Sequence, residues 1–461
     1  MAASFTHETQ IPAPVGDVFD YHRRATALQR LTPPWEAVEV VSKEGGIENE
    51  GTTVLKVRMG PLKTEWKAVH QGYAENRKFC DVQVKGPFKY WKHTHAFRSV
   101  SEDVTELTDA IEYELPMGVL GRLFAEGMVK KKLSRMFVYR HSITQNDLCH
   151  FMQFKDRSVG HVAITGGNGL IGSALAVFLT AMGHRVTILS RSGKSKVFGV
   201  KGVRWDPANQ FIDEEELGRV DAWIHLAGQN IADGRWNAKR KEVLTSSRVD
   251  VTRFLSEFII RQPEPPSVFV SASGTGYYGS VSDPTSEAGS KGDGFLADLC
   301  ELWEEASSSL SDAGIRRVIL RTGVVLDKRG GALAKLLPPF VSGVGGRVGS
   351  GHQYWNWIVM DDLLRIYDSA IRDASMEGIF NAVAPTPVTN RVFTKSLGHV
   401  LKRPTLFPVP AFALKTLLGQ MADEALLGSQ NTVPDRLTDH GFQFDFPDLV
   451  LALRHCLGKF D

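Results

Sequence analysis

Regularly spaced glycines form the part of this 461-residue chain whose chemistry is easiest to interpret. They lie in residues 162–172, VAITGGNGLIG, after a short apolar run and before a helix-forming run. Gly166 would permit a tight turn, Gly169 a close approach of the backbone to a pyrophosphate, and Gly172 a close contact between helix and strand. The helix N-terminus would present free N–H groups and a partial positive charge to phosphates. This pattern predicts a dinucleotide-binding site.

The cofactor preference depends on the end of the next apolar run, residues 186–190. An acidic residue there would bind the ribose 2′-hydroxyl of NAD. This chain has Arg191 instead, and a guanidinium fits a 2′-phosphate, so we predict NADP as the cofactor. The alternative is a surface arginine that binds no ligand. The residues expected at the cofactor are Thr165, Gly166, Asn168, Gly169, Leu170, Ile171, Gly172, Arg191, Leu226, Ala227 and Gly228.

Apolar and helix-forming runs alternate through residues 161–400. Beyond the first two apolar runs, others lie at 222–228, 268–273 and 317–325. Strands that alternate with helices form a parallel sheet with helices on both faces. We therefore predict a doubly wound α/β fold of the Rossmann type for this region.

Several short motifs in this region resemble those of the extended short-chain dehydrogenases/reductases, the group that contains the sugar epimerases and dehydratases. They are TGGNGLIG, HLAG, a serine-containing strand end before YYG, LRTGVVL and WIVMDD. Residues 401–461, which include FPVPAFALKTLLG, resemble the C-terminal module of an atypical subgroup of the NAD-dependent epimerase family, whose members are sometimes labelled cell-division inhibitors. The resemblance implies a nucleotide-binding domain followed by a small helical module.

The same resemblance implies an active site with a Tyr–Lys pair, a serine and an asparagine. The tyrosine passes a proton to the substrate oxygen, the lysine lowers the pKa of that tyrosine, and the serine polarises the oxygen. Ser273 occupies the serine position, with Ser271 as a second choice. Leu296 and Cys300 stand where the Tyr–Lys pair should be, and Arg248 replaces the asparagine. The resemblance therefore implies the fold and the cofactor but not the usual mechanism.

The replacing residues have chemistry of their own. Arg248 would bring a fixed positive charge that stabilises an oxyanion or holds a carboxylate. Cys300 is either a nucleophile or redox thiol in an electropositive site, or a buried helix cysteine. Tyr278 is expected to replace the missing proton donor, although Tyr277 and Tyr278 would equally serve as pocket wall. Glu304 is a further candidate, expected at a helix surface or as a capping partner.

Residues 1–147 have a different pattern. A strand at 4–11 and a short helix near 15–22 come first. Runs that alternate with a period of two and are separated by turns follow at 52–59, 64–73, 78–85, 90–97 and 104–115, and we expect each to be a strand. A long helix at about 119–141 follows. This order resembles the START/Bet v 1-like (polyketide cyclase) fold and implies a helix-grip α+β domain with an apolar cavity between sheet and helix. The polar stretch 148–160 is expected to be a linker.

One strand of this domain carries two histidines. Trp91, His93, His95 and Phe97 alternate in the sequence, so they share one face of the strand. That face is either packed or at the surface, or it lines a ligand site. Two histidines at this spacing without a third ligand make a poor metal site, so we predict no metal.

The composition of the chain excludes several other classes of function. The chain has 54 Lys and Arg against 52 Asp and Glu, a formal net charge of +2, and therefore no electrostatic basis for nucleic-acid binding. Its four cysteines form no CxxC pair, as in proteins of a reducing compartment. No apolar run is long enough to span a bilayer, and the N-terminus lacks a secretory signal. We expect a cytoplasmic protein with small-molecule partners, for which a homodimer is a compatible state.

Two functions agree with these residues. The first is an NADP-dependent oxidoreductase or epimerase-like enzyme without the Tyr–Lys pair, acting on a substrate that the first domain holds if that substrate is apolar. The second is a non-catalytic module that binds NADP(H), reports redox state and is coupled to a hydrophobic-ligand-binding domain. The absent Tyr–Lys pair favours the second function, and Ser273 with Arg248 favours the first.

Overall fold

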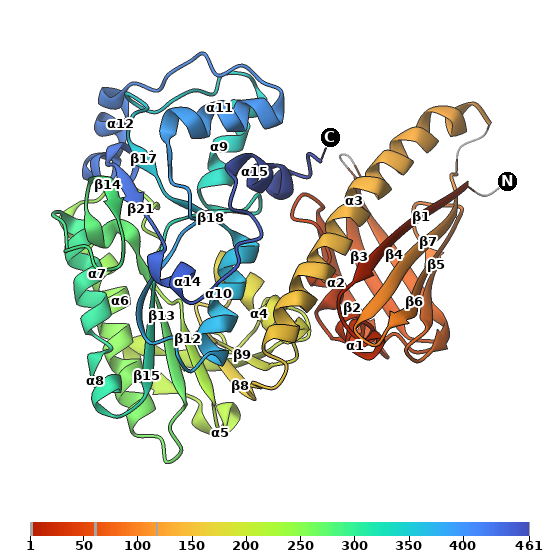
Figure 1. The fold of residues 1–461 in the computed structure, drawn as a ribbon, viewed down its shortest axis with the longest axis horizontal. Helices are drawn as coiled ribbons and strands as arrows, with labels where there is room; N and C mark the ends of the chain where they lie inside the picture. Colours follow the sequence, from red (N-terminus) through yellow and green to blue (C-terminus); the bar gives the residue numbers. More distant parts are fainter. Residues whose placement is uncertain (1–2, 60–61, 117–118, 461) are drawn as a thin grey trace. The chain divides into compact units, whose positions relative to one another are not determined.

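The computed structural model describes residues 3–59, 62–116 and 119–460, which form two compact units (Figure 1). Unit 1 comprises Met1–Asp156 with Thr180–Gly183 and Phe460–Asp461. Unit 2 comprises Arg157–Leu179 and His184–Lys459. Each unit has its own sheet and is described by itself.

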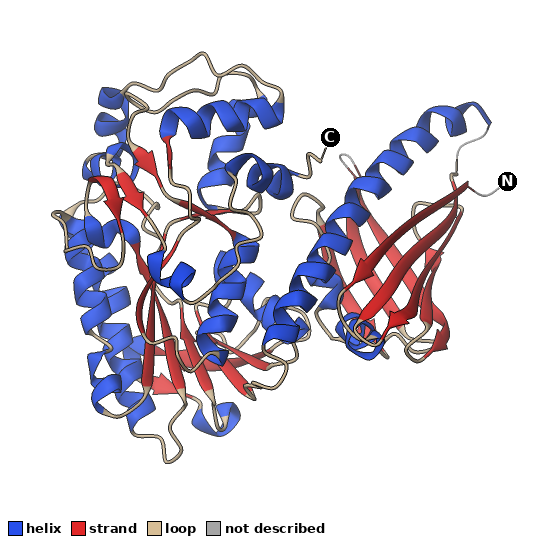
Figure 2. Ribbon diagram, viewed as in Figure 1, coloured by secondary structure: helices blue, strands red, loops and turns tan. Residues whose placement is uncertain are grey.

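Unit 1 is an antiparallel sheet that curves around one long helix (Figure 2). The strand order is β1-β7-β6-β5-β4-β3-β2. The strands are β1 (Ala3–Ile11), β2 (Val38–Glu44), β3 (Thr52–Met59), β4 (Leu62–Ala74), β5 (Lys78–Lys85), β6 (Tyr90–Ser101) and β7 (Val104–Glu114), and the helices are α1 (Val15–Arg23), α2 (Ala27–Arg30) and α3 (Val119–Gln153). This arrangement confirms the expected helix-grip fold.

Helix α3 is longer than the sequence predicted. Its apolar side packs on the sheet, where Leu133 and Phe137 join a buried cluster with Trp91 of β6. It then continues past His141 to Gln153, into the stretch expected to be a linker. The polar composition of that stretch is misleading because its first residues, Leu148 and His150, are buried. Asp147, directly before it, is also buried and accepts hydrogen bonds from Arg30 Nε and Tyr21 Oη, both at 2.7 Å.

Unit 2 is built on an eight-stranded sheet of order β11-β10-β9-β8-β12-β13-β15-β19. Every pairing in this sheet is parallel except that of β10 with β11. The strands are β8 (His161–Thr165), β9 (Arg185–Ser190), β10 (Lys201–Asp206), β11 (Phe211–Ile212), β12 (Ala222–His225), β13 (Val268–Gly274), β15 (Arg316–Thr322) and β19 (Gly378–Ala382). The chain proceeds from β8 toward one edge and returns to continue from β12 toward the other, so the doubly wound prediction is confirmed. The switch point lies between β8 and β12, where open α/β sheets bind their ligands.

Helices of unit 2 lie on both faces of this sheet (Figure 2). They are α4 (Leu170–Ala181), α5 (Glu214–Leu217), α6 (Ala238–Ile260), α7 (Phe295–Glu305), α8 (Ser308–Asp312) and α10 (Met360–Arg372). Two more helices, α9 (Gly331–Val341) and α11 (Asn390–Leu401), pack beyond the sheet in a cluster with the C-terminal segment. A cluster on one side of the sheet joins Trp223 and Phe269 of β12 and β13 with Leu255 and Phe258 of α6. These contacts fix the strand ends that form the site.

The C-terminal segment packs into unit 2 and is not a separate compact body. It contains α12 (Ala411–Leu418), α13 (Gln420–Ala422), β21 (Gln430–Thr432), α14 (Asp435–Asp439) and α15 (Leu449–Leu457), and β21 pairs with β14 (Val281–Thr285). Two more strand pairs, β16 (Val324–Leu326) with β18 (Trp357–Val359) and β17 (Tyr354–Trp355) with β20 (Val388–Thr389), complete this part. Leu453 of α15 and Trp357 of β18 share one buried cluster, so the segment extends the core of unit 2.

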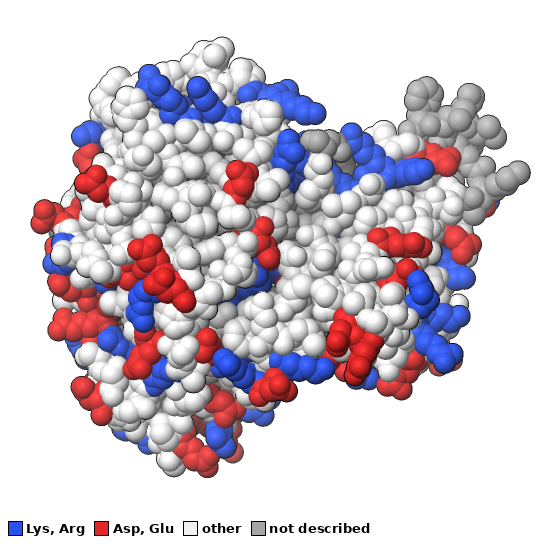
Figure 3. Space-filling view, in the orientation of Figure 1, with Lys and Arg blue, Asp and Glu red and all other residues white. Residues whose placement is uncertain are grey.

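Acidic and basic side chains occur together on both units in the face shown by Figure 3. This mixture agrees with the small net charge of the chain. In the described residues, no helix is both long and apolar enough to cross a membrane.

Candidate functional site

The glycine-rich turn connects β8 to α4 at the switch point of the unit 2 sheet. Gly166 has a φ of +69°, and a Cβ there would lie 2.6 Å from the carbonyl oxygen of Leu226. A Cβ on Gly172 would lie 2.4 Å from the carbonyl oxygen of Gly166, so the helix can begin this close to the turn only with glycine. A Cβ on Gly169 would meet only Gly166 O, at 3.2 Å, which leaves the space beside it open. The turn therefore fits a pyrophosphate, with the first amides of α4 directed at it.

We predict that Gly172→Ala abolishes measurable binding of NADPH. The added methyl group would lie 2.4 Å from a backbone oxygen, so α4 must move away from the turn that holds the phosphates. Calorimetric titration measures the loss. Gly16→Ala is the matched control, because a Cβ at Gly16 has no atom within 4 Å, and it should bind like the unmutated protein. Full affinity in Gly172→Ala would contradict the role assigned to this turn.

The ends of β8 and β12 lie side by side, so Thr165 and the segment 226–228 meet as expected. The Leu226 amide donates to Thr165 O at 3.1 Å. His225 is buried between two hydroxyl groups, Thr165 Oγ1 at 2.7 Å and Thr252 Oγ1 at 3.0 Å. Burial lowers the pKa of His225 to about 3, so this imidazole is neutral and holds the two strand ends together.

The loop after β9 is attached to the glycine turn by Asn168. Its side-chain amide donates to Lys194 O at 2.9 Å, and its Oδ1 accepts from the Lys196 amide at 2.8 Å. Asn168 was expected at the cofactor, but its side-chain amide is used to position this loop. Arg191 is exposed in the same loop. Lys194 and Lys196 add two positive charges there that were not predicted at the cofactor, although the sequence has three cations within these six residues.

A buried ion pair occupies the ends of β13 and β15. Glu304 of α7 accepts from Arg321 Nε at 2.8 Å and from Arg321 Nη2 at 2.7 Å. Ser273 Oγ donates to Glu304 at 2.6 Å, and Arg321 Nη1 donates to Tyr278 Oη at 3.0 Å. Tyr278 Oη in turn donates to Asn381 Oδ1 at 2.8 Å. These five side chains form one hydrogen-bonded network.

This network corrects three expectations. Tyr278 has only 1% of its surface exposed, and burial raises its pKa, so its phenol cannot reach a substrate as the structure stands. Ser273 directs its hydroxyl to Glu304 and leaves no donor for a substrate oxygen in this conformation. Glu304 lies in the core and not at the helix surface, because Arg321 balances its charge there. The sequence contained Arg321, but its partner 17 positions away depends on tertiary packing.

Arg248 lies against the cofactor segment that follows β12. Its Nη2 donates to Gln229 O at 2.9 Å, and a Cβ on Gly228 would lie 3.1 Å from Arg248 Cζ. The guanidinium stacks over Trp303, 5.1 Å from the ring centroid. Within the described part of the chain, its Nε has no hydrogen-bond partner, and burial lowers the pKa of Arg248 to about 10. Arg248 is thus a buried cation with unused hydrogen-bonding capacity beside the switch point.

Cys300 is the buried helix cysteine of the two alternatives considered. Burial, followed by the Glu304 charge, raises the pKa of Cys300 to about 11, and Arg248 offsets only part of that increase. A thiol with this pKa is ionised in about one molecule in ten thousand at pH 7, so Cys300 is a poor nucleophile. Burial and the raised pKa therefore favour the buried-cysteine alternative over the reactive thiol.

We predict that alkylation of Cys300 by iodoacetamide is slow at pH 7 and accelerates about tenfold per pH unit up to pH 10. Because the folded-state pKa is raised, the reactive thiolate appears only as the pH rises toward it. Mass spectrometry of each cysteine peptide measures the rate, and Cys149, which is less buried, gives the internal comparison. Rapid labelling of Cys300 at neutral pH in the folded protein would restore the catalytic interpretation.

Unit 1 contains the cavity expected from its pattern. Its volume is about 280 Å³, and it opens between the sheet and α3. Its apolar lining includes Leu31, Ile47, Leu55, Trp66, Phe88 and Met136. Trp91, His93 and His95 also line it, which supports the ligand-lining alternative for these residues, whereas Phe97 packs in the core.

We predict that Ala68→Phe weakens binding of an apolar probe such as 1-anilinonaphthalene-8-sulfonate about tenfold or more. Ala68 is buried on the cavity wall, so a benzyl group there fills part of the space. Fluorescence titration of the full chain measures the affinity. Val100→Phe changes an exposed side chain of β6 and should have no effect. Equal affinity in both variants would mean that the probe binds elsewhere.

The glycine turn at the switch point of a doubly wound parallel sheet defines a dinucleotide-binding protein of the Rossmann class. Comparison with family models agrees with this class and with the domain order. Residues 162–382 match the NAD dependent epimerase/dehydratase family, and residues 11–140 match the family described as polyketide cyclase / dehydrase and lipid transport. Residues 409–456 match a domain of unknown function.

The chain belongs to the NAD dependent epimerase/dehydratase family, among the proteins called epimerase family proteins. It is 39% identical to one from Mycobacterium bovis over 63% of this chain and 96% of that protein. A solved structure described as the nucleoside-diphosphate sugar epimerase from Corynebacterium glutamicum matches with a TM-score of 0.79 and 33% identity, covering 98% of this chain and 90% of that one. Human epimerase family protein SDR39U1, solved with NADPH, matches with a TM-score of 0.59 and 34% identity over 64% of this chain and 99% of that one. The family models confirm the resemblance of each unit, and these relatives confirm that of unit 2.

Proposed function

We propose that unit 2 binds NADP(H) and catalyses an oxidoreductase or epimerase-like reaction on a small molecule without a Tyr–Lys pair. The observation that carries the cofactor choice is Arg191, exposed at the end of β9 where an acidic residue would select NAD. Lys194 and Lys196 lie in the same loop, which Asn168 holds beside the glycine turn. The NADPH in the human relative supports the same choice.

The residues of unit 2 have separate roles in this proposal. When bound, NADP(H) would supply a hydride donor or acceptor. The glycine turn and the N-terminus of α4 would hold the pyrophosphate, and Arg191 the 2′-phosphate. Arg248 would place a fixed positive charge beside Gly228 and offset negative charge on a substrate oxygen.

The buried network would act indirectly, as support for the site. Ser273, Tyr278, Glu304 and Arg321 connect β13, the turn after it, α7 and β15, and so would keep the ends of β13 and β15 in position beside β12. Leu296 has no proton to give, and Cys300 is buried with a raised pKa, so in this proposal neither serves as the acid. A proton needed in any carbonyl reduction would then come from solvent or from the substrate.

We also propose that unit 1 binds an apolar ligand in its cavity of about 280 Å³. The family model that matches unit 1 is described as polyketide cyclase / dehydrase and lipid transport. The presence of both units in one chain suggests that this ligand is the substrate of unit 2.

The catalytic proposal is tested by following NADPH oxidation in the presence of a panel of aldehydes and ketones that includes long-chain members. We expect turnover with at least one apolar compound, and we expect Arg248→Met to lower kcat while leaving NADPH affinity within a factor of about three. A protein that binds NADPH tightly but oxidises it with no compound of the panel would favour the non-catalytic, redox-reporting alternative.

A further inference from the structure

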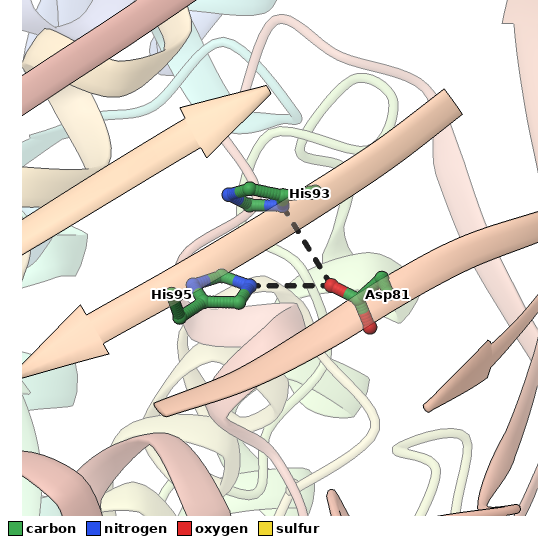
Figure 4. A group of neighbouring side chains, drawn as sticks. All are labelled: Asp81, His93 and His95. Carbon is green, nitrogen blue, oxygen red and sulfur yellow. Dashed lines mark hydrogen bonds and ion pairs between the residues drawn. The ribbon is translucent and has the colours of Figure 1, made fainter. Parts of the chain in front are cut away.

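Three side chains with metal-ligand chemistry meet on the wall of the unit 1 cavity (Figure 4). Asp81 lies on β5, directly opposite His93 of the neighbouring strand β6. His95 follows two positions later and shares the face of His93. Their nitrogen and oxygen donor atoms all lie within 4.8 Å of one another. The sequence predicted no metal because the two histidines have no third ligand near them in the chain. The antiparallel pairing of β5 with β6 brings Asp81 to them as a third ligand.

Two of the three distances between these donor atoms are close to those around a metal ion, and the third is within 4.8 Å. Asp81 Oδ2 lies 3.6 Å from His93 Nδ1 and 3.2 Å from His95 Nε2. A tetrahedral ion with bonds of about 2.0–2.2 Å separates its ligand atoms by about 3.3–3.6 Å. Hence an ion could occupy the space between the three donors with small movements of the side chains. Figure 4 shows both ring nitrogens directed at the same carboxylate oxygen.

Asp109 of β7 provides the outer contacts that metal-binding histidines commonly have. Its Oδ1 lies 2.7 Å from His93 Nε2 and 2.6 Å from His95 Nδ1. The His93 contact is a hydrogen bond, whereas His95 Nδ1 is at ion-pair distance from Asp109 without hydrogen-bond geometry. The other nitrogen of each ring faces Asp81 Oδ2. A carboxylate behind a ligating histidine fixes its tautomer and makes the facing nitrogen a better ligand. The same carboxylate also accepts from His141 Nε2 at 2.7 Å, which holds it in place.

The access of Asp81, His93 and His95 to the cavity distinguishes a metal site from a purely structural ion-pair cluster. Asp109 is buried completely, as expected for a structural carboxylate, with 3% of its side chain exposed. Asp81 keeps 25% of its side chain exposed, and its Oδ1 is held by His70 Nε2 at 2.8 Å. Asp81, His93 and His95 all border the cavity, so the fourth side of an ion bound there would face the cavity. Three protein ligands with one open position are typical of catalytic or ligand-binding metal sites and not of closed structural ones.

We propose that Asp81, His93 and His95 bind one divalent transition-metal ion of the Zn²⁺ type, whose open position takes an oxygen atom of the cavity ligand. Two imidazoles and one carboxylate suit Zn²⁺ and its neighbours better than Mg²⁺ or Ca²⁺, which prefer oxygen ligands alone. The ion would give a largely apolar cavity a single point that orients an oxygen-containing ligand.

The test uses the full chain, stripped of metal with a chelator and transferred to chelator-free buffer. Titration with ZnCl₂ is expected to show one saturable site per chain, and Co²⁺ at the same site should give visible absorption of a nitrogen-ligated, low-coordinate ion. Asp81→Asn, His93→Gln and His95→Gln should each weaken Zn²⁺ binding by more than the 10–100-fold that loss of an outer contact costs. Asp109→Asn should weaken it by about 10–100-fold.

His22→Gln is the matched control. His22 lines the same cavity and forms a hydrogen bond to Val18 O through Nδ1, but it is not one of the three proposed ligands. Its loss should therefore leave Zn²⁺ affinity nearly unchanged. Absence of a saturable site in the unmutated chain, or equal Zn²⁺ affinity in His93→Gln and His22→Gln, would overturn the proposal. If the ligand variants do not fold, the Co²⁺ spectrum of the unmutated chain decides, because a spectrum of hexaaqua Co²⁺ alone would also overturn it.

Discussion

Arg191→Asp is expected to weaken NADPH binding by about 10–150-fold. The substitution removes one charge-assisted contact to the 2′-phosphate, which contributes about 1.5–3 kcal/mol, and it adds a carboxylate that repels that phosphate. NADH affinity should stay the same or rise, since the new carboxylate can accept from the ribose 2′-hydroxyl. The measurement is calorimetric titration of both cofactors with both proteins.

Lys201→Asp is the charge-matched control for this prediction. Lys201 is exposed at the start of β10, the strand beside β9, and its Nζ donates to the carbonyl oxygen of Glu216 at 2.6 Å, so its charge is directed at α5 and not at the loop after β9. It should leave the ratio of NADPH to NADH affinity unchanged. Equal affinities for the two cofactors in the unmutated protein would refute the proposed role of Arg191.

Arg321→Met is expected to lower the free energy of unfolding of unit 2 by about 3–5 kcal/mol, because it leaves the buried Glu304 carboxylate without its cation. Glu304 has 10% of its side chain exposed and Arg321 has 2%, so water cannot replace the lost partner. The double variant Glu304→Leu, Arg321→Met should recover much of the loss, since replacing both charges removes the unpaired one. Urea unfolding followed by near-ultraviolet circular dichroism measures the change, and the transition of unit 2 is the one that NADPH shifts.

Lys291→Met provides the comparison for this pair. Lys291 pairs with Asp298 and Glu301, which lie on α7, the helix that carries Glu304. The charge of Lys291 and those of its two partners are partly or largely exposed. Its loss should cost about 1 kcal/mol or less. If Arg321→Met cost no more than Lys291→Met, the network would not be holding the strand ends, and Ser273 and Tyr278 would again be candidates for contact with a substrate.

Local patterns in the sequence predicted the architecture of both units because each pattern is typical of one kind of element. The alternation in residues 104–115 led to β7, and the glycines of 166–172 led to the turn between β8 and α4. β2 was missed because its run, VEVVSKE, alternates only weakly. The end of α3 was placed too early, near residue 141, because Asp147 resembles an exposed loop residue until its buried partner Arg30 is known.

The sequence by itself determined where a dinucleotide could bind, because the residues that form a phosphate site are adjacent in the chain and glycine has a direct conformational meaning. It also identified Leu296, Cys300 and Arg248 as departures from the usual reductase site. Only the tertiary structure decided what the charged and polar side chains do. Glu304 and Arg321 come from different elements, as do Asp81 and His93, and only the packing of those elements brings each pair to close range, as a buried ion pair and as part of the proposed metal site.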